Sequence, residues 1–447
     1  MMKYYIASLL LLSAFFSFAE QSISGSKSSY HYSTIPTLTA APPGYQPFYI
    51  NHIGRHGARY ISKSKYETII QQILQLAEQQ QLTILGRDLL TQLNKIIALN
   101  HNQYGKLTEL GKDDLKQIAS RMLHHYPTIF HGNHIATMST TSQRTIDSAR
   151  AFLSPFEALY ANLEIQQQPE HNQTLLRFFD YSPAYTKYKN SHQLKQQIHT
   201  LEQTDLTKFF SQHIIHRIFT PSFISKLNNG IKMTDETIIT STDFVIALFN
   251  IFQETFSFTP EILHSNQINF DNYFTPLEKE WFTTVVTAKN YLQIGPAFDN
   301  NGIQIKIAAP LLLEIIRSSD HAIHSNDTDA NFRFAHAETL SPLATLMELE
   351  GTFQITDTIE NYPHFWHAEQ IIPMGANIQL IFYRSTDITQ PLLVKVLLNE
   401  REIHLPVETT RYPYYQWTDV KQFYINKLNH LGLTEEEDIK HWLLNLN

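Results

Sequence analysis

The sequence has no cysteine among its 447 residues. Disulfide bonds are therefore excluded, and a chain of this length needs a large hydrophobic core to hold it together. Beyond the first twenty residues there is also no apolar run that reaches the roughly 18 to 20 residues of a membrane-spanning helix. These absences leave a globular chain with room for one large domain that carries an insertion, or for two domains.

A surplus of positive charge is absent as well, since the formal net charge is −8 at pH 7. The broad positive field that attracts nucleic acid is missing, and we expect no nucleic-acid partner. An anionic small molecule would have to be attracted by a local basic cleft.

Recognised metal-binding patterns are missing although the chain has 22 histidines. Pairs such as His131 and His134 lack the carboxylate and cysteine partners of established zinc sites, and no HExxH motif occurs. The sequence therefore predicts no metal and no other cofactor.

The first nineteen residues have the pattern of a signal peptide. Met1 to Ala19 contains one lysine, then a long apolar run, and ends in Ser17-Phe18-Ala19 before Glu20. We therefore expect an exported protein with no membrane attachment after cleavage. The absence of cysteine favours a bacterial periplasm, with the extracellular space as the alternative. Residues 20–45 are rich in serine, threonine and proline, and we expect them to be extended.

The stretch from Asn51 to Arg59, Asn-His-Ile-Gly-Arg-His-Gly-Ala-Arg, places a histidine between two arginines on a glycine-containing turn. The apolar run Phe48-Tyr49-Ile50 before it predicts a buried strand, and Gly54 and Gly57 let the chain turn and approach a ligand closely. Guanidinium groups match phosphate oxygens, and a histidine nitrogen can attack phosphorus. This stretch therefore predicts a phosphate site that contains a nucleophile.

Two later stretches have a similar strand-to-helix form. Asn331 to Leu340 alternates aromatic residues like a strand, ends at His336 and Glu338, and is followed by a helix-like segment. The other stretch precedes it in the sequence: a short predicted strand, Ile135 to Met138, leads into a predicted helix that has Arg144 near its N-terminus. Helix N-termini attract anions through unpaired amides and the helix dipole. If the sheet is open and wound with helices on both faces, the ends of these strands converge at one ligand site.

The motifs RHGAR, followed by ISK, and HAE resemble the signature of the histidine acid phosphatases, within the histidine phosphatase superfamily. The HAE spelling is similar to the multiple inositol polyphosphate phosphatase branch. The resemblance implies that His56 accepts the phosphoryl group and that Glu338 protonates the leaving alcohol. It implies the following phosphate-binding residues: Arg55, Arg59, Arg144 and His336. It also suggests these substrate-binding residues: Ser62, Lys63 and Arg177. The chain has Ile61 where family members commonly have a proline, which leaves the loop shape open.

The resemblance also implies an α/β fold, with an open doubly wound sheet, flanking helices and an inserted helical cap, as in phosphoglycerate mutases. We expect the catalytic domain to comprise residues 46–161 and 303–447. Residues 162–302, which have helical patterns and little strand signal, would form the cap.

The implied function is an exported acid phosphomonoesterase that hydrolyses inositol hexakisphosphate and other inositol polyphosphates through a phosphohistidine. One alternative is a general histidine acid phosphatase acting on sugar phosphates or bisphosphoglycerate. A second is a non-catalytic protein that binds a phosphate ligand, and a third is a metal-dependent phosphoesterase. A second HAE, His367 to Glu369, lacks an alternating strand before it, so we prefer the pair His336 and Glu338. The sequence does not indicate an oligomeric state.

Overall fold

The computed structural model describes residues 23–30, 37–132, 134–160, 166–167, 170–434 and 437–446. The predicted signal peptide, residues 1–19, lies outside these ranges. The chain forms two compact units. Of the described residues, those in 23–28, 59–106 and 195–289 belong to the helical unit, and those in 29–58, 107–194 and 290–446 belong to the sheet unit. These bounds differ from those expected for the cap, 162–302: residues 59–106 group with the helical unit, whereas 170–194 and 290–302 group with the sheet unit.

The sheet unit is built on a mixed sheet with the strand order β10-β8-β7-β1-β6-β2-β3, and β9 pairs with β8. Its parallel part consists of β1 (Tyr45–Arg55), β6 (Ala330–Ala335), β2 (Ile135–Ser139) and β3 (Gln166–Gln167). The strands β7 (Asn377–Ser385), β8 (Leu393–Leu398), β9 (Arg401–Glu402) and β10 (Tyr415–Gln416) are antiparallel to their neighbours. The strands predicted at 48–50, at 135–138 and before His336 are confirmed.

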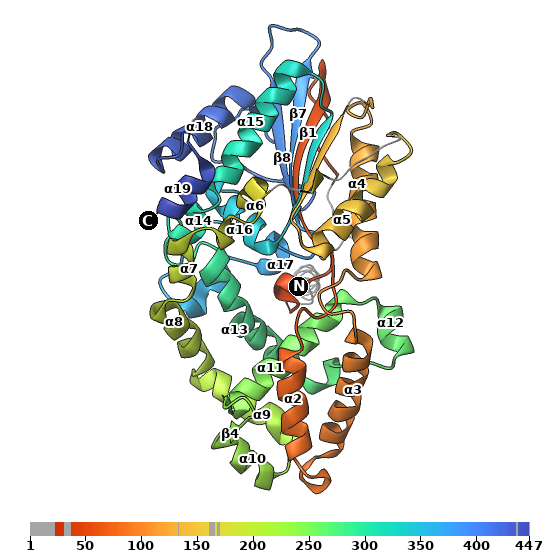
Figure 1. Cartoon of the computed structure of the whole chain (residues 1–447), viewed down its shortest axis with the longest axis vertical. Helices are drawn as coiled ribbons and strands as arrows, with labels where there is room; N and C mark the ends of the chain where they lie inside the picture. Colours follow the sequence, from red (N-terminus) through yellow and green to blue (C-terminus); the bar gives the residue numbers. More distant parts are fainter. Residues whose placement is uncertain are drawn as a thin grey trace, which may run out of the picture. The chain divides into compact units, whose positions relative to one another are not determined.

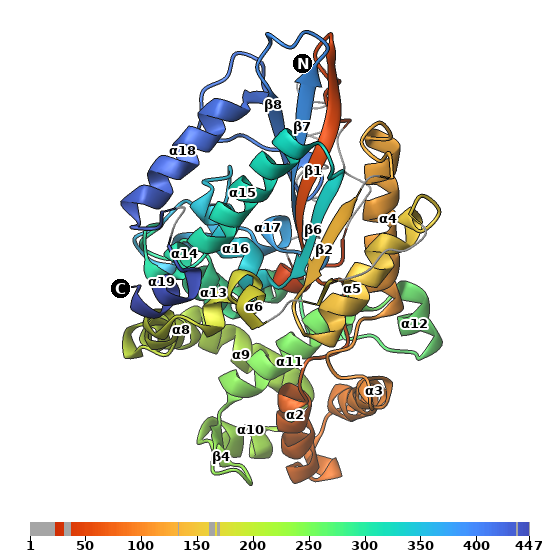
Figure 2. The same cartoon turned by 45° about the horizontal axis from the view of Figure 1, so that its top comes forward.

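Helices cover both faces of this sheet (Figures 1 and 2). On one face lie α4 (Glu109–His125) and α5 (Gln143–Leu153). On the other lie α15 (Ala309–Ser325), α16 (Ala337–Leu346) and α18 (Trp417–His430). Because both faces are covered, β8 is buried along its whole length instead of alternating between apolar and polar residues. The predicted open, doubly wound α/β sheet is confirmed.

Alternation along the strands decides which side chains face which helices. Phe332 and Phe334 of β6 point toward α5, where both rings pack against Phe152. His52 of β1 lies on the same side, 4.9 Å from the ring of Phe152 between centroids. This aromatic layer belongs to the main hydrophobic core between the sheet and α4 and α5.

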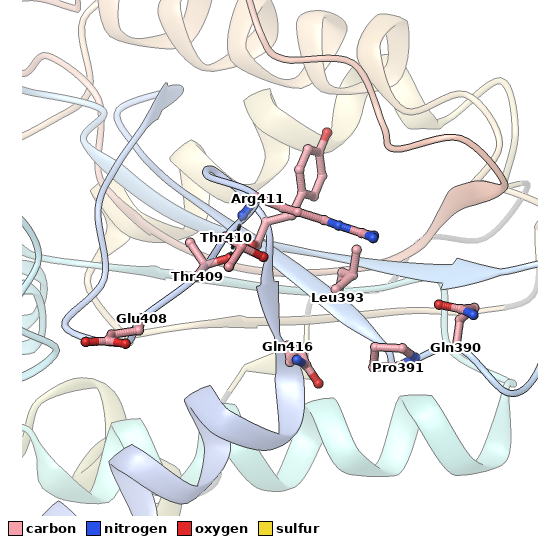
Figure 3. Close-up of a pocket in the computed structure, with 9 residues that line it drawn as sticks. Gln390, Pro391, Leu393, Glu408, Thr409, Thr410, Arg411 and Gln416 are labelled. Atoms are coloured by element: carbon pink, nitrogen blue, oxygen red, sulfur yellow. Dashed lines mark hydrogen bonds between the residues drawn. The ribbon is translucent and has the colours of Figure 1, made fainter.

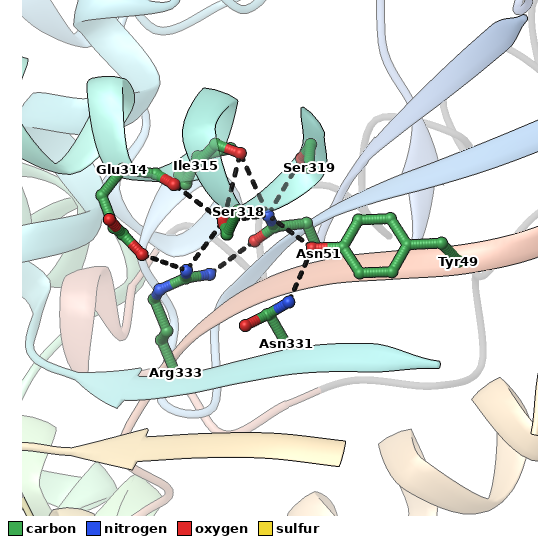
Figure 4. Close-up of polar contacts among 8 residues, drawn as sticks. All are labelled: Tyr49, Asn51, Glu314, Ile315, Ser318, Ser319, Asn331 and Arg333. Carbon is green, nitrogen blue, oxygen red and sulfur yellow. Dashed lines mark hydrogen bonds and ion pairs between the residues drawn. The ribbon is translucent and has the colours of Figure 1, made fainter. Parts of the chain in front are cut away.

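The opposite face of β1 and β6 carries a buried polar network (Figure 4). Arg333, only 1% exposed, donates through Nη1 to Asn51 Oδ1 at 2.6 Å and through Nη2 to Ser318 Oγ at 3.0 Å. Its Nη2 also pairs with Glu314 Oε1 at 3.2 Å. Asn51 donates to Tyr49 Oη at 3.0 Å. The network connects the two central strands to each other and to α15.

The remaining helices of the sheet unit are short: α6 (Glu170–Leu176), α7 (Pro183–Lys189), α14 (Ile303–Lys306), α17 (Ala368–Ile371) and α19 (Ile439–Asn445). Two helices cross the boundary between the units: α8 (His192–Glu202) and α13 (Pro276–Ile294). No helix in the described ranges is long and apolar enough to cross a bilayer.

The helical unit contains α2 (Lys65–Leu76), α3 (Ile84–Asn100), α9 (Asp205–Ile218), α10 (Pro221–Asn228), α11 (Ser241–Glu254) and α12 (Pro260–Ser265), with a small hairpin of β4 (Ile231–Lys232) and β5 (Ile238–Ile239). A capping box formed by Thr240 and Asp243 starts α11, which is apolar along most of its length and buried. Gly86 lets α3 approach α9, because a Cβ there would lie 2.2 Å from Ile218 O.

Candidate active site

Three parallel strands end at the same edge of the sheet. Arg55, the last residue of β1, is in register with Ala335, the last residue of β6, and Ser139 at the end of β2 is in register with Phe334. The residues that follow these strands are therefore neighbours. The rings of His56 and His336 lie 5.7 Å apart between centroids. The predicted convergence of strand ends that are far apart in sequence is confirmed.

Main-chain contacts hold Arg55 and His56 in place. The amide of His56 donates to Ala335 O at 3.1 Å, and its carbonyl accepts from the amide of Gly375 at 3.0 Å. The guanidinium of Arg55 donates to Ile372 O. Nδ1 of His56 lies 3.0 Å from Gly57 O, and since a carbonyl only accepts, Nδ1 carries the proton. Nε2 of His56 therefore holds the lone pair that a nucleophile needs.

The turn after His56 is packed tightly against two helices. A Cβ on Gly57 would lie 2.4 Å from Gly111 O in the first turn of α4, so only glycine fits without movement. The amide of Gly57 donates to Ser148 Oγ at 3.1 Å, and that hydroxyl donates to Arg144 O at 2.6 Å. Ser148 thus connects the turn of the expected nucleophile to the helix that carries Arg144.

Arg144 and His336 meet at the starts of two helices. Arg144 is in the first turn of α5, and His336 is the N-cap residue of α16. Arg144 Nη2 lies 3.3 Å from His336 Nδ1. His336 is 2% exposed, and burial, followed by the charges of Arg144, Arg177 and Arg55, lowers its pKa to about 2. The ring is therefore neutral in the unliganded site.

Arg177 lies at the same site, although its sequence support was weaker than that of the other arginines. It precedes the short 3-10 helix of residues 178–180, and its Nη1 is 3.3 Å from His336 Nε2. Its Nε donates to Asp180 Oδ2 at 2.6 Å, and its guanidinium lies 5.3 Å from the centroid of the Phe179 ring. The aromatic contact and the ion pair hold the guanidinium beside His336.

Glu338 occupies the first turn of α16, two residues after His336, and its side chain is exposed. Its charge is close enough to Tyr185 to contribute, after burial, to the raised pKa of that phenol. The second HAE differs in environment, because Glu369 lies 3.6 Å from His367 Nδ1. Burial raises the pKa of Glu369 to about 7. The assignment of Glu338 as proton donor stays a prediction.

Three expected ligands belong to the helical unit. Arg59 donates to Glu254 Oε2 at 3.2 Å, and Glu254 also pairs with Lys27 at 3.3 Å. Ser62 and Lys63 are exposed. The roles of Arg59, Ser62 and Lys63 in binding phosphate or substrate stay predictions.

Thr140, Thr145 and Ser148 were not anticipated as site residues. Thr140 Oγ1 lies 3.1 Å from His336 Nε2 and 2.7 Å from Thr145 Oγ1. Their signal was present in the hydroxyl-rich stretch on both sides of Arg144, from Thr140 to Ser148, where hydroxyl side chains can reach a strand end. Such residues hold others in place without touching substrate, and a motif search for charged groups overlooks them.

The arginines of the sheet-unit site make it suited to an anion. Arg55, Arg144 and Arg177 surround a neutral His336, whereas Asp180 is the carboxylate that pairs directly with one of them. Within the described residues, no group of three or more histidine, cysteine, aspartate or glutamate side chains could hold a metal ion. Guanidinium groups at helix starts bind phosphate oxygens directly.

A separate pocket of about 330 Å³ lies beside β8 and β10 (Figure 3). Its lining comprises Gln390, Pro391, Leu393, Glu408, Thr409, Thr410, Arg411, Tyr414 and Gln416. Its lining contains none of the residues at the ends of β1, β6 and β2 that are described above.

Comparison with known proteins agrees with this arrangement. The model of the histidine phosphatase superfamily (branch 2) matches residues 49–399. Human multiple inositol polyphosphate phosphatase 1 is 22% identical over 360 residues, which cover 74% of this chain and 68% of the human protein.

Two solved structures share the fold. The Bifidobacterium longum multiple inositol polyphosphate phosphatase, in complex with inositol hexasulfate, superposes with a TM-score of 0.78 at 23% identity and covers 90% of this chain and 97% of that one. The phytase from D. castellii has a TM-score of 0.70 at 15% identity and covers 96% of this chain and 88% of that one.

Proposed function

The chain belongs to branch 2 of the histidine phosphatase superfamily and is a phosphomonoester hydrolase, and on that premise we propose that it hydrolyses inositol polyphosphates, including inositol hexakisphosphate, through a phosphohistidine. The observation that carries the proposal is the meeting of His56, His336 and the arginines at three strand ends. The substrate class is supported by the names of the human and bacterial relatives.

Binding would begin with the phosphate held by guanidinium groups. In the sheet unit, Arg55, Arg144 and Arg177 supply fixed positive charge around His336. The family signature adds Arg59 to this set. Because the charge develops on oxygens of the transferred group, prearranged donors stabilise the transition state without reorganising at the moment of reaction.

His56 would then attack phosphorus with its Nε2 lone pair. A bond forms between Nε2 and phosphorus while the bond from phosphorus to the ester oxygen breaks. Glu338, protonated, gives its proton to the departing alkoxide. In the second half-reaction the ionised Glu338 removes a proton from water, which attacks phosphorus and releases phosphate from His56. An exposed carboxyl group is suited to exchange protons with solvent between the two steps.

We also propose that the protein is exported, since Met1 to Ala19 has the pattern of a signal peptide. An inositol polyphosphate would then be hydrolysed in a bacterial periplasm or outside the cell. General action on sugar phosphates or bisphosphoglycerate is the alternative that the same chemistry allows.

The testing experiment measures phosphate release from inositol hexakisphosphate at mildly acidic pH, with and without EDTA. We expect release that resists EDTA and disappears in His56→Ala. Glu338→Gln should lower turnover strongly, with Glu369→Gln as the matched control at the second HAE. Release from a simple aryl phosphate but not from inositol hexakisphosphate would refute the proposed substrate class and leave the phosphohistidine mechanism standing. Release by His56→Ala at the wild-type rate would refute the phosphohistidine.

A further inference from the structure

Both ring nitrogens of His336 have neighbours that determine where its proton lies. Nδ1 is 3.3 Å from Arg144 Nη2, and Nε2 is 3.1 Å from Thr140 Oγ1. A guanidinium nitrogen can only donate, so Arg144 bonds to the ring when Nδ1 holds a lone pair. The proton of the neutral ring is then on Nε2 and points to Thr140.

The hydroxyl groups around Thr140 lead independently to the same tautomer. Thr145 Oγ1 is 2.7 Å from Ser142 O and 3.0 Å from Thr140 O. Carbonyl oxygens only accept, so the hydroxyl hydrogen of Thr145 points at them. Thr140 Oγ1, 2.7 Å from Thr145 Oγ1, must therefore donate its own hydrogen to Thr145. It is left to act as an acceptor toward Nε2 of His336.

Nε2 of His336 has a second neighbour, since Arg177 Nη1 lies 3.3 Å from it. The hydroxyl direction that Thr145 sets assigns the Nε2 proton to Thr140, and Arg177 has other acceptors. Its donors are directed at Asp180 Oδ2 and, at 3.3 Å, at Ser142 Oγ. The guanidinium therefore adds positive charge next to the ring.

The groups that face His336 come from every element around it. Arg55 ends β1 and His56 follows it, Arg144 is on α5, and Arg177 precedes the 3-10 helix of residues 178–180. On its own helix the titratable neighbour is Glu338. Three guanidinium charges and burial oppose a fourth positive charge, so the unliganded ring stays neutral. A bound dianion reverses this balance, because an opposite charge nearby favours the protonated ring.

We propose that Thr140 is a positioning residue that holds the Nε2 proton of His336, so that binding of a phosphate dianion is coupled to uptake of one proton at Nδ1. The neutral ring has one N–H, and that hydrogen is committed to Thr140. His336 can donate to a phosphate oxygen only after Nδ1 takes a proton from solvent. A new Nδ1–H bond forms, and Arg144 turns its Nη2 hydrogen from Nδ1 to the anion. The inference rests on the proposed function to the extent that phosphate binds beside His336.

The tautomer can be tested without ligand or turnover. Nitrogen NMR of protein labelled with ¹⁵N-histidine reports the tautomer, and the His336 signals are those lost in His336→Gln. We expect a neutral ring protonated at Nε2 in the wild type and in Thr140→Ser, and a mixture of tautomers in Thr140→Val. Saturating sulfate, a dianion at every pH used, should convert the ring to imidazolium. An Nδ1-protonated free ring, or a ring that stays neutral with sulfate, would overturn the proposal.

The coupling is measured by calorimetry of sulfate binding in two buffers with different ionisation enthalpies. Wild type should take up one more proton on binding than His336→Gln does. Thr140→Val leaves the buried Nε2–H of His336 without its acceptor, and sulfate affinity should fall by about 5- to 100-fold. Thr140→Ser keeps the acceptor and should stay within about threefold of the wild type. Equal losses in both variants would refute a role for the hydroxyl.

These measurements separate the two proposals. Proton-coupled sulfate binding by a protein that releases no phosphate from esters would refute the proposed function and leave this inference standing. If the wild type hydrolyses the ester normally but takes up no more protons on sulfate binding than His336→Gln does, this inference is refuted and the proposed function stands.

Discussion

Replacing Gly57 by alanine tests how tightly the turn after His56, the proposed nucleophile, is held. The added Cβ would lie 2.4 Å from Gly111 O and 2.9 Å from both the carbonyl carbon and Cα of Gly111. These are backbone atoms at the start of α4, and no side-chain rotation can relieve the overlap. The turn must move by about 1 Å, which costs on the order of 1–3 kcal/mol in an already packed site.

A displacement of about 1 Å at reacting groups lowers turnover about 100-fold. We therefore expect Gly57→Ala to lose about two orders of magnitude in kcat on a phosphomonoester, with unfolding in urea shifted to lower concentration. Gly351→Ala is the control: its φ is +78° and nothing lies within 4 Å of the added Cβ. It should be destabilised by about 1 kcal/mol through backbone strain alone and keep normal turnover. A Gly57→Ala protein with wild-type kcat would show that the turn is not held by this contact.

Three further predictions concern stability measured by urea unfolding. Arg333→Met leaves Glu314 and the side-chain amide of Asn51 without their donor and should lower the free energy of unfolding by about 3 kcal/mol. An unchanged urea midpoint would contradict the network in Figure 4. Burial, followed by the charge of Arg333, lowers the pKa of His52 from 6.5 to about 3, so unfolding between these pH values takes up a proton. The free energy of unfolding should therefore fall, by up to about 1.4 kcal/mol per pH unit, as pH drops from 6.5 toward 3. His52→Gln should flatten that decline between pH 7 and 5. Burial alone would raise the pKa of Glu254, but its two cationic partners, Arg59 among them, lower it below 4.5. Glu254→Gln should therefore be less stable than wild type at pH 7, and the difference in free energy of unfolding should narrow as pH falls below 4.5. A difference that does not change with pH would contradict the ion pair.

The fold and the proximity of His56 and His336 could be predicted because the signals for both are local. An apolar run followed by a glycine-containing turn predicted β1 and the position of His56 at its end. Aromatic alternation predicted β6, and the change to helical spacing placed His336 at a helix start. Because parallel strands end at one edge of a sheet, the two histidines had to be neighbours. This step follows from the general geometry of parallel sheets and needs no further information from the sequence.

Other features could not be read from the sequence because they depend on pairing between distant segments. The family resemblance suggested Arg177 as a substrate-binding residue, but nothing near it in sequence indicates that its guanidinium lies beside the ring of His336, 159 positions later in the chain. The role of Thr140 depends on a hydroxyl direction that Thr145 sets through two carbonyl contacts. The antiparallel placement of β7 beside β1 is also nonlocal, since a strand's own residues do not specify its partner or direction.

The two faces of the central strands have different tasks, and this separates stability from catalysis. Residues of β1 and β6 that face α15, such as Asn51 and Arg333, form the polar network behind the site. Residues that face α5, such as Phe332 and His52, form the aromatic layer. Each strand is followed directly by one of the two neighbouring histidines, His56 after β1 and His336 after β6, so neither histidine belongs to the network or to the aromatic layer. Substitutions within the strands should therefore change unfolding more than chemistry, while a substitution at a strand end such as His56 should change chemistry at nearly constant stability.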